Sequence, residues 1–468
     1  MARTDFTTLL STVNYTQESP GNSPLVVGMK LGHGPYSTVN ATGGLFYCLG
    51  QATGLTTDKW FAYDNASQLI ADLNSGLSGT STTFNANFVA SFGGITGPSR
   101  AMIELSSCLS TLAYGCSVVI FGSYKSMKEY QEDPTNDPLE AVVIEEQGTS
   151  IDLLTPTTNN LMLGMTTQYP GFTDSSVSPT GAYDPIMLMQ QSTAFNNCFF
   201  FHAALTGADF SIAQDVTFGV DYSNIKRYSG LDGRTGTYYN LSNGSSGYTL
   251  TSDQLTRTFC VLGKKTTEWQ FSSGNNFGYT DDVCTVYSLL AYDAAGAMAR
   301  AKSRNELFYS IAGVDRSKIL NANSVTPSFI QTNSTPLDAL KTNRVNYYLS
   351  SSTNGLFFLG SDVVGSTGTI ALENRFGPAY LKAKVTEDVY TLGEPYMFQI
   401  NNSATRSNYT TTVENYLQNY SNVLQNEYTQ VICDETNNTD NSSSLNITVT
   451  FRPLISNYDI SVTVSLQS

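Results

Sequence analysis

The sequence has few charged residues, and positive charge is the scarcest. Asp, Glu, Lys and Arg make up 13% of the 468 residues, about half of the usual share. The 24 Lys and Arg residues are outnumbered by 39 Asp and Glu, which gives a formal net charge of −15, and no basic run occurs. Nucleic acids and anionic lipid surfaces are bound mainly through clustered basic residues. We therefore expect no direct contact with nucleic acid.

Long apolar runs and secretion-type leaders are also missing. No window approaches the roughly eighteen apolar residues that a membrane-spanning helix needs. The first ten residues, MARTDFTTLL, do not have the apolar centre of a signal peptide. We expect no membrane insertion.

Side chains for metal or nucleophilic chemistry are sparse. The chain has two histidines, His33 and His202, and its seven cysteines form no Cys-x-x-Cys motif, so a zinc-type site is not indicated. No G-x-S-x-G motif is present, and Gly263-Lys264 is followed by Lys265 rather than by the Ser or Thr of a phosphate-binding loop. The sequence therefore predicts free thiols, no catalytic residue, no metal and no cofactor. We expect a protein that is not an enzyme.

Aromatic and small polar residues are abundant instead. Aromatics reach 12%, mostly Tyr and Phe, a composition that favours β structure. Apolar runs predict strands at 24–29, 116–121 and 196–206, and apolar residues at helical spacing predict a helix between Met102 and Leu112. Helix-to-strand units of this kind are typical of α/β layers. Two further amphipathic helices are predicted, at 283–302 and 408–424.

The end of the chain has the pattern of two successive strands. Apolar and polar residues alternate in both, with period two. The apolar residues of the first strand are Leu445, Ile447, Val449 and Phe451, and those of the second are Ile460, Val462, Val464 and Leu466. The connection is too long for a two-residue hairpin turn. Two possibilities stay open: the last strand folds back onto its own sheet, or it joins the sheet of a neighbouring copy.

From about Val283 onward, an ordered set of motifs resembles one family. The stretch AAGAMARAKSRNELFYSIAG carries Ala295, Gly296, Ala299, Arg300, Phe308 and Ala312 in step with the family pattern, whereas Lys302, Glu306 and Ile311 depart from it. Further on, the matching residues are Leu340, Val345, Asn346, Phe398, Asn401, Tyr428, Val431, Cys433, Asp434, Glu435 and Asn438. These motifs, over roughly the last 40% of the chain, resemble the contractile tail sheath proteins of tailed bacteriophages (myovirus type). The paired arginines common before the family's long helix are absent, and LKAKV stands there.

The resemblance implies a multidomain chain, α/β and α+β, in which an α/β body is joined to a β-rich C-terminal domain that exchanges strands with neighbouring subunits. Its expected parts are an extended arm at 1–22, a body at 24–330 with a variable outer region near 130–280, a sheath domain at 331–457 and a donated strand at 458–468. Strand exchange would involve Asp5, Thr7, Leu9 and Val13 of the arm, Leu445, Ile447, Val449 and Phe451 of the receiving sheet, and Ile460, Val462, Val464 and Leu466 of the donated strand. Arg406 and Glu414 would face the tail tube.

The implied role is structural. Copies of the chain would form hexameric rings, stacked helically around a tail tube, and would contract to drive the tube through the host envelope. The implied partners are other copies, the tube protein, and the baseplate and tail terminator proteins. The implied location is the virion tail, after assembly in the host cytoplasm. Two alternatives remain: a sheath of a phage-derived contractile injection system, and a carbohydrate-binding or carbohydrate-active tail protein that uses the Tyr-rich 215–280 region for stacking on sugars.

Overall fold

The structure is a computed structural model of the whole chain. It describes residues 25–30, 60–69, 89–92, 95–98, 100–121, 124–144, 193–205, 226–227, 256–270, 283–306, 308–326, 345–358, 360, 362–363, 375–440 and 442–454. All statements below concern these residues.

The chain divides into two compact units. The body unit comprises Met1–Glu306 and Ile311–Ile370, and the C-terminal unit comprises Leu307–Ser310 and Ala371–Ser468. A short stretch in the middle of the chain thus belongs by its contacts to the C-terminal unit. The limits expected from the sequence, 24–330 and 331–457, refer to functional parts and stay predictions.

The body unit is built around a mainly parallel sheet. Its strands are β1 (Val26–Lys30), β2 (Trp60–Tyr63), β5 (Ser117–Phe121), β6 (Ala141–Ile144), β7 (Phe199–Leu205), β8 (Lys226–Arg227) and β9 (Thr258–Leu262). The order is β2-β5-β1-β6-β7, and both β8 and β9 pair with β7. Neighbours among β1, β5, β6, β7 and β9 run parallel, and β2 and β8 are antiparallel to their partners.

This sheet confirms the α/β character of the body. Its central strands are mostly apolar and are buried, as the fully enclosed side chains of Val27, Val118, Val142 and Phe199 illustrate. Strands covered on both faces need such continuous apolar runs. The helix and three strands predicted in this part are observed as α3 (Arg100–Leu112), β1, β5 and β7.

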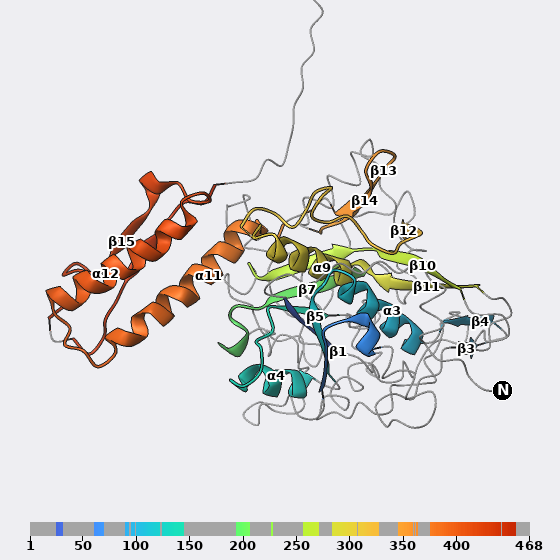
Figure 1. Cartoon of the computed structure of the whole chain (residues 1–468), viewed down its shortest axis with the longest axis horizontal. Coiled ribbons are helices and arrows are strands. Elements are labelled where there is room, and N and C mark those ends of the chain that lie inside the picture. The colour runs from blue at the N-terminus through green and yellow to red at the C-terminus, as the bar shows by residue number, and fades with distance from the viewer. Residues whose placement is uncertain are drawn as a thin grey trace, which may run out of the picture. The chain divides into compact units, whose positions relative to one another are not determined.

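Helices accompany the sheet. In the part of the body that the structure describes, they include α3, α4 (Tyr124–Glu132) and α9 (Leu290–Ser303). α3 and α9 contact each other, α9 also contacts β6, β7 and β9, and α4 contacts β1 and β5 (Figure 1). α9 is rich in alanine, and a Cβ at Gly296 would lie 2.2 Å from the ring of Tyr114. Glycine at this position therefore lets the segment after α3 approach α9 closely.

A buried ion pair lies beside this contact. Lys265 Nζ is 2.8 Å from Asp293 Oδ1, and both side chains are fully enclosed. The Tyr114 hydroxyl donates to the same oxygen at 2.8 Å. Burial raises the pKa of Asp293, and the facing ammonium of Lys265 opposes that shift. Breaking one member of such a pair costs stability, because it leaves the other charge buried without compensation.

The remaining strands of the body form smaller sheets. They are β3 (Val89–Phe92) with β4 (Ile95–Pro98), β10 (Lys264–Gln270) between β11 (Val283–Leu289) and β12 (Ser324–Thr326), and β13 (Tyr348–Ser351) with β14 (Gly355–Phe358). The helix predicted over 283–302 is therefore wrong in its first part, because 283–289 form strand β11. VCTVYSL contains β-branched and aromatic residues and pairs with β10 over seven positions, and this pairing outweighs the helical spacing of its apolar residues.

Parts of the expected outer region near 130–280 belong to the main sheet. β6, β7 and β9 all fall within that range, and Phe259 and Val261 of β9 are buried. Apolar strands of this kind are stable only inside a sheet with covered faces. Most of the Tyr-rich 215–280 segment lies outside the described residues.

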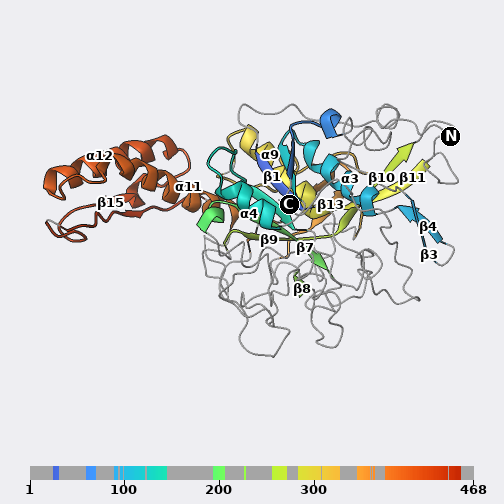
Figure 2. The same cartoon turned by 90° about the horizontal axis from the view of Figure 1, so that it is seen from below.

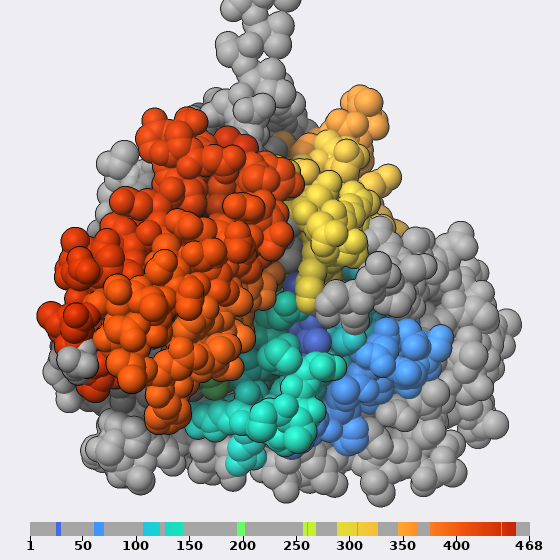
Figure 3. Space-filling view, turned by 60° about the vertical axis from the view of Figure 1, so that its left-hand side comes forward, coloured from blue at the N-terminus to red at the C-terminus, as the bar shows by residue number. Residues whose placement is uncertain are grey.

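The C-terminal unit pairs two long helices with a small sheet. Its elements are α11 (Phe376–Gly393), η5 (Glu394–Tyr396), α12 (Ser403–Leu417), η6 (Gln418–Tyr420), η7 (Asn426–Tyr428), β15 (Gln430–Ile432) and β16 (Thr448–Thr450). α11 and α12 contact each other, and α12 contacts β15 (Figure 1 and Figure 2). Its residues, coloured orange to red, gather into one patch of the space-filling view (Figure 3). In the described residues it contains more helix than the β-rich domain expected from the sequence.

One apolar core joins the helices and the sheet. Its fully buried members are Leu381, Val385 and Val389 of α11, Tyr409, Val413 and Leu417 of α12, and Val423, Leu424 and Cys433. The Tyr409 hydroxyl donates to the carbonyl of Val389 at 2.6 Å, and burial raises the pKa of Tyr409 to about 12. α12 begins earlier than the predicted residue 408, because the Asn402 side chain accepts a hydrogen bond from Thr405 N–H and caps it. It ends at Leu417, where the chain tightens into η6.

No described helix is long and apolar enough to cross a membrane. Within the same residues, no group of three His, Cys, Asp or Glu side chains is placed to hold a metal ion.

Candidate functional site

The sheet of the C-terminal unit has two strands and an open edge. β15 and β16 pair antiparallel, with Gln430 opposite Thr450 and Ile432 opposite Thr448. No third strand joins them among the described residues. A strand edge of this kind exposes a row of unpaired N–H and C=O groups.

The pairing of β16 extends beyond its three residues at both ends. At the start, the Asn438 side chain donates to the Asn446 carbonyl at 2.7 Å and accepts from the Asn446 N–H at 2.6 Å. At the end, Gln425 N–H donates to the Arg452 carbonyl at 2.9 Å, and Leu454 N–H donates to the Val423 carbonyl at 2.8 Å. The expected strand at 445–451 is thus present as a longer extended segment around β16.

These bonds fix which backbone groups face the open edge. In an extended chain, the N–H and C=O of successive residues point to opposite edges. Asn446, Arg452 and Leu454 all bond on the β15 side, so Thr448 and Thr450 do as well. The intervening residues therefore direct their main-chain groups to the other edge, where they have no partner among the described residues; these are Leu445, Ile447, Val449 and Phe451. These are the four residues that the family resemblance assigns to the receiving sheet in strand exchange.

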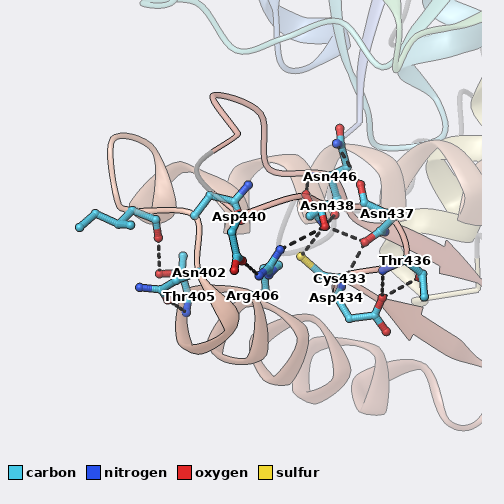
Figure 4. A network of polar contacts seen from close by, with 12 residues as sticks. Asn402, Thr405, Arg406, Cys433, Asp434, Thr436, Asn437, Asn438, Asp440 and Asn446 are labelled. Carbon is cyan, nitrogen blue, oxygen red and sulfur yellow. Dashed lines mark hydrogen bonds and ion pairs between the residues drawn. The ribbon is translucent and has the colours of Figure 1, made fainter.

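A polar network holds the β15–β16 connection in place (Figure 4). Asp434 accepts from Thr436 N–H at 2.8 Å and from the Thr436 hydroxyl at 2.6 Å. These two hydrogen bonds hold the pKa of the Asp434 carboxyl below its usual value, and the bond from the Thr436 hydroxyl contributes most. Asn437 Nδ2 donates to the Ile432 carbonyl at 2.8 Å, and Asn438 Nδ2 lies 3.7 Å from Cys433 Sγ. Burial raises the pKa of the Cys433 thiol, so this cysteine is a structural part of the core.

Arg406, expected to face a tube, points into this network instead. Its side chain is 2% exposed. One guanidinium nitrogen donates to the Asn438 carbonyl at 3.2 Å and another pairs with the Asp440 carboxylate (Figure 4). The guanidinium is therefore already used inside the unit. Glu414, the other expected tube contact, is exposed on α12, and its role stays a prediction.

An apolar groove of about 1100 Å³ adjoins the open edge. One wall carries Leu445, Ile447, Val449 and Phe451, and the opposite wall comes from α11 and the turn that follows it. No residue of β15 lines it, so the groove lies on the free side of β16. The apolar and aromatic residues of its second wall include Val385, Val389, Tyr390, Tyr396, Met397 and Phe398.

The sequence interpretation missed this second wall. α11 was not predicted as a helix, although Leu381, Val385 and Val389 recur at four-residue spacing and Pro378 suits a first helical turn. Tyr390, Met397 and Phe398 are 73%, 57% and 101% exposed. Apolar side chains this exposed and this close together mark interaction surfaces.

Eight of the expected exchange residues lie outside the described residues. They are Asp5, Thr7, Leu9 and Val13 of the N-terminal arm and Ile460, Val462, Val464 and Leu466 of the last strand. Their participation in a neighbouring sheet stays a prediction.

Comparison with known proteins gives a partial sequence match and matches in fold that cover nearly the whole chain. The chain aligns over 97% of its length with a chain of the anti-feeding prophage (AFP) baseplate, at a TM-score of 0.50 and 11% identity, covering 97% of that chain. A chain of the same baseplate in its contracted state aligns with a TM-score of 0.50 and 12% identity, covering 97% of this chain and 95% of the other. At these identities the likeness concerns the fold alone.

A relative in sequence is the tail sheath protein of Enterobacteria phage T4. It is 28% identical to this chain over 150 residues, which is 32% of this chain and 22% of the relative. No family model matches the sequence. The resemblance to tail sheath proteins noted from the motifs is confirmed by these comparisons.

Proposed function

We propose that the chain is a structural, non-enzymatic subunit of a contractile sheath that polymerises around a tube and shortens to drive the tube forward. The observation that carries the proposal is the free edge of β16, with its adjoining apolar groove, in a chain with a sheath-like fold. An edge and groove of this kind accept an extended segment by β-augmentation: main-chain hydrogen bonds supply affinity, and alternate side chains select the register.

The segment that fits this edge is residues 458–466 of a second copy. Its apolar residues recur at every second position, so they would all lie on the face that continues the apolar face of β16. Nine extended residues span about 30 Å, more than enough to cover the four edge-facing residues. The N-terminal arm, with Asp5 and Thr7 among its alternating positions, has less apolar character and suits a less enclosed edge.

Donation from one copy to the next gives an assembly that grows without closing. Each subunit would receive one strand and donate another, and hexameric rings stacked helically would be one such arrangement. The compact units could then rotate while the exchanged strands keep neighbours connected. Contraction would release free energy held in subunit packing behind a kinetic barrier, with no nucleotide consumed.

The remaining partners follow from the proposed role. Baseplate contacts at one end, a terminator at the other and a tube inside would complete the particle, which would be assembled in the host cytoplasm and carried in the virion. The alignment with an anti-feeding prophage chain fits a sheath of a phage-derived injection system equally well.

Electron microscopy of the purified chain and of a variant that lacks 458–468 tests the proposal. The full chain should form rings or hollow tubes, and the variant should stay folded but unassembled. Tubes formed by the truncated variant would contradict strand donation by this segment.

Amide hydrogen exchange resolved to single residues gives a second test with an internal control. In the truncated variant, Ile447 and Val449 should exchange fast and Thr448 and Thr450 slowly, because only the latter pair bond to β15. In tubes, all four should be protected. Equal exchange of the four amides in the truncated variant would contradict the assigned edge.

A further inference from the structure

We propose that the turn between α11 and α12 closes over the docked strand, with Phe398 as its apolar anchor and Asn401 as an additional hydrogen-bond acceptor. This inference rests on the proposed docking at β16 and names the residues that would hold the strand there.

Phe398 is presented to solvent in an unfavourable backbone conformation. Its side chain is fully exposed, and its φ is 66°. Left-handed backbone is uncommon for residues other than glycine, Asn and Asp, and is strained for a bulky side chain. Among the described residues of the C-terminal unit, none covers this ring, so no burial of its apolar surface offsets the backbone strain.

The exposed position is held by hydrogen bonds rather than by a loose loop. Met397 N–H donates to the Glu394 carbonyl at 3.0 Å, and Gln399 N–H donates to the Tyr396 carbonyl at 3.2 Å. The Gln399 side chain donates to the Pro395 carbonyl at 2.7 Å, and the Tyr396 hydroxyl lies 2.9 Å from that of Thr412 on α12. The turn is therefore organised before any partner binds, which lowers the entropic cost of binding.

The turn forms one rim of the groove whose other wall is β16. Phe398, Met397 and Tyr390 line it together with Ile447 and Val449. A strand added to β16 continues the sheet, so its apolar side chains would lie on the face that packs toward α11. Phe398 would then cover these side chains from the rim.

Asn401 supplies a polar group at the same groove. Its side chain donates from Nδ2 to the Ser444 carbonyl at 2.8 Å, while its Oδ1 is buried and has no hydrogen-bond partner among the described residues. The residue is 7% exposed and lines the groove. An unpaired buried acceptor costs stability until a donor arrives, and a small shift of the turn on closing would let a backbone N–H of the docked strand bond to it.

The proposed occupant of the groove is residues 458–466 of a second copy. Fourteen residues follow Leu454, the last described residue, and Ile460, Val462, Val464 and Leu466 among them alternate with polar residues. An alternating strand matches a site with one apolar wall and one hydrogen-bonding edge.

The test measures binding of a synthetic peptide of residues 456–468 to the chain that lacks 458–468, by fluorescence anisotropy. The key variant is Phe398→Ser, and the matched control is Ile400→Ser, because Ile400 is 70% exposed on the same turn but does not line the groove. We expect Phe398→Ser to weaken binding at least about tenfold, as loss of an aromatic anchor does, and Ile400→Ser to leave it nearly unchanged. Phe398→Gly, which suits a positive φ, keeps the turn folded and should weaken binding to the same extent.

Each outcome separates this inference from the proposed function. Equal affinity for Phe398→Ser, Phe398→Gly and Ile400→Ser overturns the anchor but leaves docking at β16 intact. A peptide that does not bind the truncated chain, or a peptide of residues 4–15 that binds there instead, overturns the proposed occupant. Tube formation by the truncated chain overturns the proposed function itself.

Discussion

The side-chain amide of Asn438 makes both hydrogen bonds to Asn446 that a neighbouring strand would make. Nδ2 donates to the Asn446 carbonyl at 2.7 Å, and Oδ1 accepts from its N–H at 2.6 Å. The Asn438 side chain thereby extends the β15–β16 pairing, but only on the side of β16 that faces β15. The backbone N–H and C=O groups of Leu445 and Ile447 point to the opposite side, toward the groove.

Asn438→Ala should destabilise the C-terminal unit by about 2 kcal/mol, since it removes two part-buried hydrogen bonds to the Asn446 backbone, each worth about 1 kcal/mol. Asn446→Ala is the control, because it removes only a 3.2 Å bond from its side chain to the Asn437 carbonyl and keeps both backbone bonds. Urea unfolding measures the difference. Equal losses in the two variants would show that the Asn438 bonds do not hold the ladder.

The carboxylate of Asp434 should make stability depend on pH in the acid range. Hydrogen bonds from Thr436 keep the pKa of Asp434 below its ordinary value of 3.8. A depressed pKa in the folded state means that the stabilisation is present above the unfolded value and is lost as the pH falls through the folded one. Asp434→Asn should therefore unfold more easily than the parent at neutral pH, and the difference should shrink below about pH 3.8. Thermal unfolding at several pH values measures this; a pH-independent difference would argue against the ionised form.

Local patterns in the sequence predict some of the candidate site, and long-range contacts decide the rest. Alternation identifies Leu445, Ile447, Val449 and Phe451 as one face of a strand, since a period of two depends only on adjacent residues. The sequence pattern does not tell which edge of this strand stays free, because that depends on the hydrogen bonds between Asn438 and Asn446. The groove needs α11, whose charged and apolar residues intermix.

The body shows the same division. Apolar runs predict β1, β5 and β7, whereas the parallel order of the sheet follows from pairings between distant segments. Val283–Leu289 has apolar residues at helical spacing but forms β11, since β10 is available to pair with it over its full length. Arg406 gives no sign in the sequence that its charge is buried, because its partner Asp440 lies in a loop far along the chain.

Arg406 and Glu414 should respond differently to substitution. Arg406→Ala removes a buried guanidinium with bonds to Asn438 and Asp440 and should lower stability by about 2 to 3 kcal/mol. Glu414→Lys changes an exposed charge and should alter stability by less than about 0.5 kcal/mol. If Glu414 faces a tube, the second variant should instead change the salt dependence of co-assembly with the tube protein, as measured by sedimentation. A stable Arg406→Ala protein with defective co-assembly would reverse the two assignments.

Gly296→Ala tests the closest packing in the body. Helix propensity alone favours alanine by up to about 1 kcal/mol. The added Cβ would lie 2.2 Å from the Tyr114 ring, which cannot move freely, because its hydroxyl bonds to Asp293 and the guanidinium of Arg300 lies 4.7 Å from its centroid. Overpacking costs about 1 to 3 kcal/mol, so the net effect should be destabilising.

A double-mutant cycle with Tyr114→Leu isolates the steric contribution. With the ring gone, Gly296→Ala should become neutral or stabilising, because only the propensity gain remains. The coupling between the two positions should therefore exceed the roughly 0.5 kcal/mol that independent sites show. The same loss in both backgrounds would mean that the clash with Tyr114 is not what requires glycine in α9.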